Sequence, residues 1–251
     1  MTVKLFNDNF QNFKSYNLPA KAQLLIADIP YNLGSNAYIS RKEGWIDNDV
    51  SKGRACPRDK KFFNTDEHFN IAEFFHFASK MLKPEPKDIG KAPAMIVFCS
   101  WQQIPSVIDY GAKYGFLKAY PLYFIKNNSP QSLKANMKIV GAVETAIVLY
   151  RQKLPKFNND GHMILNWFPW STDDKSVPRI HPTQKPVSLL KRLISIFSDR
   201  GDTVIDLVAG SASTLRACAE LGRNAFGFEI DKSFFNAAKD KMLSNLCSSL
   251  F

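Results

Sequence analysis

The sequence predicts an α/β fold built on a doubly wound, mainly parallel sheet, and three observations carry that prediction. Apolar runs of strand length alternate with segments of helical periodicity along much of the chain. Three of the strand-like runs lead directly into an acidic residue, Asp28, Asp206 or Glu229. Glycine and other small residues follow closely after Asp206, as in the strand-to-helix turns of ligand-binding sheets.

The elements follow one another in a regular order. Strands are expected at residues 24–27, 95–99, 119–125, 145–150, 203–205 and 224–228. Helices are expected at residues 69–82, 104–113, 186–197, 213–221 and 234–246. Ligands of doubly wound sheets bind beyond the carboxyl ends of the strands, so the three acidic residues are expected at a functional edge. The segments 34–66 and 151–180 are long for simple connections, which favours functional loops.

Composition narrows the class of protein. The chain has 251 residues, enough for one large domain, and a formal net charge of +10. An excess of Lys and Arg favours a polyanionic partner, because basic side chains near phosphates release condensed counterions. No apolar run approaches the ~20 residues of a membrane helix, and no signal peptide is expected, so a cytoplasmic protein is predicted. Neither a disulfide framework nor a metal site is expected, since no cysteine has a suitably spaced partner among Cys56, Cys99, Cys218 and Cys247.

Residues 203–222 read as a strand, a small-residue turn and a helix, T-V-I-D-L-V-A-G-S-A-S-T-L-R-A-C-A-E-L-G. Small side chains at Ala209, Gly210 and Ser211, next to Asp206, let the backbone approach a ligand closely. Glu229 follows Gly210 by 19 residues, the usual spacing of a ribose-diol acceptor. Because G-x-G-x-x-G is absent, a nucleoside without phosphates such as S-adenosylmethionine fits better than a dinucleotide. Taken alone, the motif fits a structural turn equally well.

Residues 24–33, L-L-I-A-D-I-P-Y-N-L, place an acid, a proline and an aromatic ring directly after a buried strand. Such a turn can serve an amino group whose lone pair is delocalised into an aromatic ring, as in adenine. Two hydrogen-bond acceptors on the amino hydrogens can free that lone pair for attack. The carboxylate of Asp28 can supply one acceptor, and the backbone carbonyl of Ile29 the other. Pro30 stiffens the turn, and Tyr31 offers a stacking face for a base removed from its duplex.

Three motifs together resemble those of the amino-group DNA methyltransferases of the permuted β group. They are D-I-P-Y at 28–31, H-P-T-Q-K-P at 181–186 and D-L-V-A-G-S-A-S-T at 206–214. The resemblance covers nearly the whole chain. It implies one Rossmann-like S-adenosylmethionine-dependent methyltransferase domain over residues 1–251, with a circularly permuted motif order in which the catalytic motif comes first.

The resemblance also implies further site residues. Asp8, in an N-terminal acidic motif, and Thr183 and Lys185, in the H-P-T-Q-K-P signature, are implied as cofactor-binding residues. Residues 151–180 correspond to a short target-recognition segment, and residues 34–66 to a second loop facing double-stranded DNA. Candidates for contacts with DNA are Arg41, Lys52, Arg54, Arg58, Lys126 and Asn128.

Four residues in three places differ from the family pattern. Ile29 stands where the family has proline, which makes the catalytic turn less rigid. Leu207 and Val208 replace Pro-Phe. Ala212 replaces the second glycine of the cofactor turn, at a cost on the order of 1 kcal/mol if that position needs a positive φ.

An initial aspartate in the tetrapeptide leans toward N6 of adenine as the methyl acceptor, with N4 of cytosine as the alternative. From another class of protein, a non-catalytic nucleic-acid-binding subunit that keeps the fold is a second alternative. Related enzymes often dimerise, which leaves a homodimer open. A role in restriction-modification or as a separate DNA-methylation enzyme, in a prokaryote or a phage, fits the same reading.

Overall fold

The computed structural model describes residues 1–16, 18, 21–31, 69–127, 132–134, 139–181 and 183–244. An eight-stranded sheet runs through it in the order β1 (Val3–Phe6), β10 (Asn224–Phe228), β9 (Thr203–Asp206), β2 (Leu24–Asp28), β3 (Ala94–Cys99), β7 (Val143–Tyr150), β4 (Lys118–Ile125) and β8 (Trp167–Pro169). All neighbours pair in parallel except where β7 pairs with β3 and β4. The predicted mainly parallel sheet is therefore confirmed.

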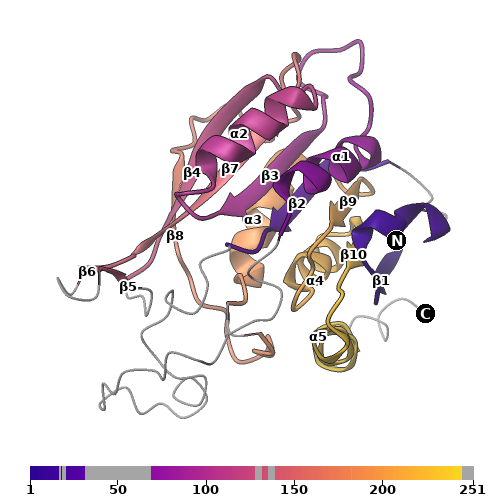
Figure 1. The fold of residues 1–251 in the computed structure, drawn as a ribbon, viewed down its shortest axis with the longest axis vertical. Helices are drawn as coiled ribbons and strands as arrows, with labels where there is room; N and C mark the ends of the chain where they lie inside the picture. The colour runs from indigo at the N-terminus through magenta and orange to yellow at the C-terminus, as the bar shows by residue number, and fades with distance from the viewer. Residues whose placement is uncertain are drawn as a thin grey trace.

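Helices cover both faces of the sheet (Figure 1). On one face α1 (Ile71–Met81) and α2 (Ile104–Lys113) share an apolar core with η1 (Phe10–Tyr16). On the other face α3 (Val187–Phe197) and α4 (Ser213–Glu220) form a second core, which η5 (Ala238–Met242) joins through Met242. The central strands β2 and β3 are buried almost throughout, because they carry apolar side chains toward both helical layers.

Most predicted elements lie within two residues of their observed bounds. The helix predicted at 234–246 differs, because α5 begins at Lys232 and ends at Ala237, where the π-helical η5 takes over. Asp231 fixes the earlier start by accepting hydrogen bonds from the backbone N–H groups of Ser233 and Phe234. Edge strands β1 and β8 have no counterpart in the sequence prediction, nor does the short pair β5 (Ser132–Lys134) and β6 (Ile139–Val140).

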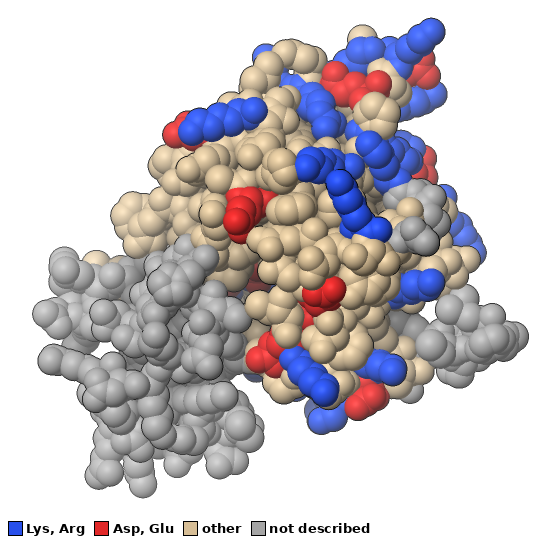
Figure 2. All heavy atoms as spheres, turned by 45° about the vertical axis from the view of Figure 1, so that its right-hand side comes forward, with Lys and Arg blue, Asp and Glu red and all other residues tan. Residues whose placement is uncertain are grey.

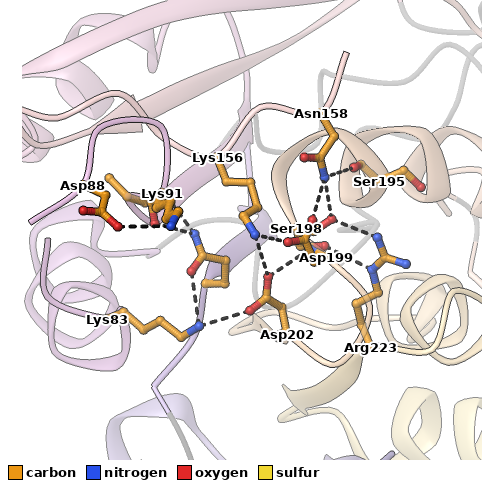
Figure 3. Close-up of polar contacts among 12 residues, drawn as sticks. Lys83, Asp88, Lys91, Lys156, Asn158, Ser195, Ser198, Asp199, Asp202 and Arg223 are labelled. Carbon is orange, nitrogen blue, oxygen red and sulfur yellow. Dashed lines mark hydrogen bonds and ion pairs between the residues drawn. The ribbon is translucent and has the colours of Figure 1, made fainter. Parts of the chain in front are cut away.

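Polar contacts tie distant segments together at the amino ends of the strands (Figure 3). Lys83 Nζ lies 3.1 Å from Asp202 Oδ1, just before β9. Lys156 pairs with Asp199 and lies 3.9 Å from Asp202 Oδ2. Asn158 Nδ2 donates to the carbonyl oxygens of Ser195 and Ser198 at 3.0 and 3.1 Å. The first part of the segment 151–180 thus belongs to the scaffold at the end of the sheet remote from the acidic strand ends.

Candidate active site

The predicted catalytic turn, residues 28–31, is held from two sides. Ile29 is buried, and its backbone N–H donates to the carbonyl oxygen of Phe98 on the neighbouring strand at 3.1 Å. Gln103 Nε2 donates to the carbonyl oxygen of Pro30 at 2.8 Å, while Gln103 Oε1 accepts from the N–H of Ser100 at 3.0 Å. The turn was expected to be less rigid because Ile29 stands where the family has proline. These contacts hold it in place instead. The Ile29 carbonyl accepts no hydrogen bond from the described residues, so it remains available as an acceptor.

Asp28 ends β2 and meets a buried lysine. Lys185 Nζ lies 2.6 Å from Asp28 Oδ2 and 2.9 Å from Glu144 Oε2, and its side chain is 7% exposed. Lys126 forms a short ion pair with the other oxygen of Glu144. Asp28 Oδ1 is buried and receives no hydrogen bond within the part of the chain that the structure describes. A buried acceptor of this kind marks a place where a ligand group completes the site.

The charges of this cluster influence one another. Burial raises the pKa of Asp28, against the lowering effect of the Lys185 ammonium. Burial would also raise the pKa of Glu144, but the ammonium groups of Lys185 and Lys126 outweigh it and lower that pKa. Burial disfavours the charge on Lys185, yet the carboxylates of Asp28 and Glu144 together raise its pKa. Lys185 is therefore an ammonium ion at neutral pH.

The predicted cofactor turn joins β9 to α4. Gly210 has a φ of +50° and donates its N–H to Glu229 Oε2 at 2.8 Å, which closes the turn against the end of β10. Asp206 Oδ1 accepts from the N–H of Val208 at 3.1 Å. The backbone N–H of Ala209 donates to the carbonyl oxygen of Phe228 at 2.8 Å, and Ser211 Oγ lies 2.8 Å from Ser213 Oγ. The small-residue turn that the sequence predicts therefore lies against Glu229 in the structure.

Three carboxylates line this edge, and burial raises the pKa of each. The pKa of Asp206 rises to about 7, and those of Glu229 and Asp28 also rise. Each ionised form is therefore disfavoured in the absence of a cation. S-adenosylmethionine carries a sulfonium, an ammonium and a ribose diol, so the residues present fit it. Asp206, Gly210 and Glu229 would hold it, and Gly210 keeps the backbone clear of a side chain.

The H-P-T-Q-K-P signature connects the cofactor turn to the catalytic carboxylate. The ring of His181 lies 4.3 Å from that of Phe234, and a Cβ at Gly210 would lie 3.9 Å from His181 Cδ2. Burial lowers the pKa of His181 to about 4, so the ring is neutral at neutral pH. Thr183 Oγ1 lies 3.1 Å from His181 Nδ1 and supports that ring.

The same signature clamps the second part of the segment 151–180. Gln184 Nε2 donates to the carbonyl oxygen of Pro178 at 3.1 Å, and Gln184 Oε1 accepts from the N–H of Ile180 at 3.2 Å. Asp173 accepts from the N–H groups of Val187 and Ser188 at 2.8 and 3.0 Å, and so caps α3 from a distance. Residues 170–180 are therefore fastened next to the catalytic cluster.

Some predicted site residues have roles that the sequence did not suggest. Lys185, expected at the cofactor, pairs with Asp28, the predicted catalytic carboxylate, and Lys126, expected at DNA, pairs with Glu144. Asp8 precedes η1 and contacts two of its residues, because its carboxylate accepts from Tyr16 Oη at 2.6 Å and from Asn12 Nδ2 at 2.8 Å. The remaining DNA candidates lie outside the described residues: Arg41, Lys52, Arg54, Arg58 and Asn128.

Glu144 and Gln103 belong to the candidate site through their contacts with Lys185 and Pro30, and the sequence prediction missed both. Glu144 has a recognisable signal, since it is a lone acid within the apolar run of β7, V-E-T-A-I-V-L-Y. Gln103 has none, because a glutamine before a helix is common on protein surfaces.

Charged side chains are spread over the surface. On the face in Figure 2, Lys and Arg side chains are most numerous toward the upper right, with Asp and Glu side chains among them. No cluster of potential metal ligands occurs among those residues, and none of their helices is long and apolar enough to span a membrane.

Comparison with known proteins agrees with this geometry. DNA adenine methyltransferase YhdJ of Escherichia coli (strain K12) is 28% identical over 228 residues, covering 86% of this chain and 75% of that protein. Type II methyltransferase M2.DpnII of Streptococcus pneumoniae is 26% identical over 252 residues, covering 96% of this chain and 89% of that protein. Type II methyltransferase M.HpaI of Haemophilus parainfluenzae is 23% identical over 230 residues, covering 87% of this chain and 67% of that protein.

Solved structures share the fold. The M1.HpyAVI–SAM complex aligns with a TM-score of 0.67 and 22% identity, covering 96% of this chain and 98% of that one. The cytosine-N4-specific PvuII DNA methyltransferase aligns with a TM-score of 0.67 and 16% identity, covering 98% of this chain and 92% of that one. The fold is therefore that of S-adenosylmethionine-dependent DNA methyltransferases. A family model described as DNA methylase matches residues 22–240, so the chain belongs to the DNA methylase family of N6- and N4-methyltransferases.

Proposed function

We propose that this DNA methyltransferase, an enzyme that takes its methyl group from S-adenosylmethionine, acts on the N6 amino group of adenine within a specific target sequence. The observation that carries the proposal is the position of Asp28. It lies at the carboxyl end of β2, which pairs with β9 and its cofactor turn, and it opens the turn that also holds Pro30 and Tyr31. The similarity to an enzyme named as a DNA adenine methyltransferase supports the choice of base.

The chain's own residues account for acceptance of the methyl group. The Asp28 carboxylate and the Ile29 carbonyl accept hydrogen bonds from the two N–H groups of the flipped-out amino group, which turns its nitrogen lone pair toward the methyl donor. The ring of Tyr31 stacks on the base. S-adenosylmethionine, when bound, supplies a methyl group already activated by its sulfonium. Positioning and electrostatics then provide most of the rate enhancement.

Double-stranded DNA is the proposed macromolecular partner and the cytoplasm the proposed compartment. The segments at 34–66 and 151–180 are proposed to share target recognition within a single methyltransferase domain. A homodimer remains a separate question, which analytical ultracentrifugation with and without DNA answers.

Transfer of labelled methyl from S-adenosylmethionine to unmodified plasmid DNA, followed by nucleoside mass spectrometry, tests this function. We expect N6-methyladenine from the wild type and none from Asp28→Ala, because the variant lacks the carboxylate acceptor. Asp88→Ala is the matched control, since it removes an exposed aspartate paired with Lys91 at the far end of the molecule.

If the product is N4-methylcytosine, the methyl acceptor is cytosine and the proposed choice of adenine is wrong. Absence of product from a wild type that binds both S-adenosylmethionine and DNA would overturn the proposal in favour of a non-catalytic subunit.

A further inference from the structure

Lys185 belongs to the H-P-T-Q-K-P signature, in which other side chains contact the cofactor turn or residues 178–180. Lys185 instead contacts the carboxylate of Asp28. We propose that Lys185 is a positioning residue that keeps Asp28 ionised and oriented, and that Glu144 sets the strength of this effect. The inference rests on the amino-group methylation proposed above for its catalytic meaning, but it holds for either base.

The surroundings of Lys185 are built for a fixed cation. Its side chain is 7% exposed, and its Nζ lies 5.2 Å from the ring centroid of Phe98, 5.7 Å from that of Tyr31 and 5.9 Å from that of Trp170. Aromatic faces attract a cation and exclude water from it. A long, flexible side chain is thereby fixed with its ammonium 2.6 Å from Asp28 Oδ2.

Four charges alternate in sign across the site, from Lys126 to Glu144, Lys185 and Asp28. Their sum is zero when all four are ionised. Removing one partner of a buried ion pair leaves an uncompensated charge, which the protein relieves by changing a protonation state. Loss of Lys185 therefore favours protonation of Asp28.

The arrangement suits the chemistry that Asp28 must perform. An ionised carboxylate is an acceptor only, with about four lone-pair positions, whereas a protonated one is also a donor. Lys185 occupies one of these positions and fixes the plane of the group, which leaves others for the amino group of the base. A protonated Asp28 would present a donor to another donor.

Other elements also bring charged or titratable groups toward Asp28. The carboxylates of Glu144 and Asp206 repel that of Asp28, whereas the ammonium groups of Lys185 and Lys126 attract it. The other titratable groups near Asp28 or Lys185 are Tyr31, Cys99 and His181.

Two variants change the charge on Asp28 in opposite directions. In Lys185→Met the pKa of Asp28 is expected to rise, because the nearest ammonium is gone. In Glu144→Gln it is expected to fall, because a like charge disappears while the ammonium stays. Damage to the fold cannot produce two shifts of opposite sign. Lys191→Met is the matched control, because it removes a lysine that pairs with Glu220 on the surface of α3.

Carboxyl ¹³C NMR of the protein without cofactor, with Asp28 assigned by its loss in Asp28→Asn, measures the pKa directly. Methyl transfer measured across pH gives the second readout. For Lys185→Met we expect kcat at neutral pH to fall on the order of 100-fold, with partial recovery as pH rises and little change in S-adenosylmethionine affinity. For Glu144→Gln the acid limb of kcat moves to lower pH.

An unchanged Asp28 titration in both variants overturns the inference. A weakened S-adenosylmethionine affinity with unchanged kcat in Lys185→Met does so as well, and makes Lys185 a cofactor ligand. If Lys185→Met does not fold, the direction of the Glu144→Gln shift decides. A wild type that methylates no base contradicts the proposed function, whereas the NMR titration still tests the positioning of Asp28.

Discussion

Ala212 stands where the family pattern has a glycine. It is fully buried at the start of α4, with φ 59° and ψ 26°, so the positive φ considered from the sequence is present. An L-residue in this region costs about 1–2 kcal/mol. Against that, its buried methyl contributes about 0.8 kcal/mol, and alanine restricts the unfolded chain by about 0.4–1 kcal/mol relative to glycine. The opposing contributions nearly cancel.

We therefore expect Ala212→Gly to leave the free energy of unfolding within about 1 kcal/mol of the wild type. Ala212→Val should lower it by more than about 2 kcal/mol, since a β-branched side chain is unfavourable at positive φ and overfills the core. Urea unfolding of the three proteins measures both values. A large stabilisation by glycine would mean that the alanine strains the turn.

The residues of the candidate site differ in whether the sequence alone could predict their positions and contacts. Asp28, Gly210 and Glu229 could be predicted because each occupies a fixed place relative to its own strand or turn. The partnership of Lys185 with Asp28 could not, since 157 residues separate them and only the packed sheet brings them together. The hydrogen bond from Gln103 to Pro30 could not be predicted for the same reason, since the two residues are 73 positions apart.

At the scale of elements, periodicity located the buried strands and amphipathic helices but not the edges. The strands β1 and β8 are four and three residues long and partly exposed, which is too short for a strand periodicity to be recognised. The segment 151–180 appeared as one loop, whereas the structure divides it. Asn158 anchors its first part to the amino ends of the strands, and Gln184 fastens its last part beside the catalytic site.

This division predicts a specific effect for Gln184→Ala. The variant removes two hydrogen bonds that hold Pro178 and Ile180 next to the site. If residues 170–180 contact the target, we expect KM for DNA to rise about tenfold, while S-adenosylmethionine affinity stays unchanged. Steady-state kinetics with each substrate varied in turn separates the two. Equal effects on both substrates would show that Gln184 supports the cofactor turn instead.

For the whole molecule, the excess of positive charge lies mostly outside the segment that was expected to face DNA. Residues 32–68 contain seven basic and six acidic residues, so most of the net charge of +10 belongs to the rest of the chain. A uniform electrostatic attraction to DNA would therefore draw on basic residues outside this segment as well.

We expect residues at the amino ends of the strands to contribute to stability and residues at the carboxyl ends to contribute to function. Strand β9 allows the sharpest test of this expectation. Asp202 precedes this strand and pairs with Lys83, whereas Asp206 ends it in the cofactor turn. Asp202→Asn removes partly exposed ion pairs, so the free energy of unfolding should fall by about 0.5–1 kcal/mol with unchanged turnover.

Asp206→Asn should act in the opposite sense. Burial raises the pKa of Asp206 from its ordinary value of 3.8 to about 7, so the folded protein keeps a proton that the unfolded chain releases. Wild-type stability is thus lost as pH rises between these values, and the ionised group is a burden above them. Asparagine carries no charge to bury. The variant should therefore be more stable than the wild type at about pH 8 and similar to it at about pH 4. Its S-adenosylmethionine affinity should fall about 10- to 100-fold, because an ionic acceptor is lost. Chemical unfolding at the two pH values and calorimetric titration with the cofactor check both effects. A loss of stability at the higher pH would show that Asp206 is a structural residue and that the two ends of β9 do not differ in kind.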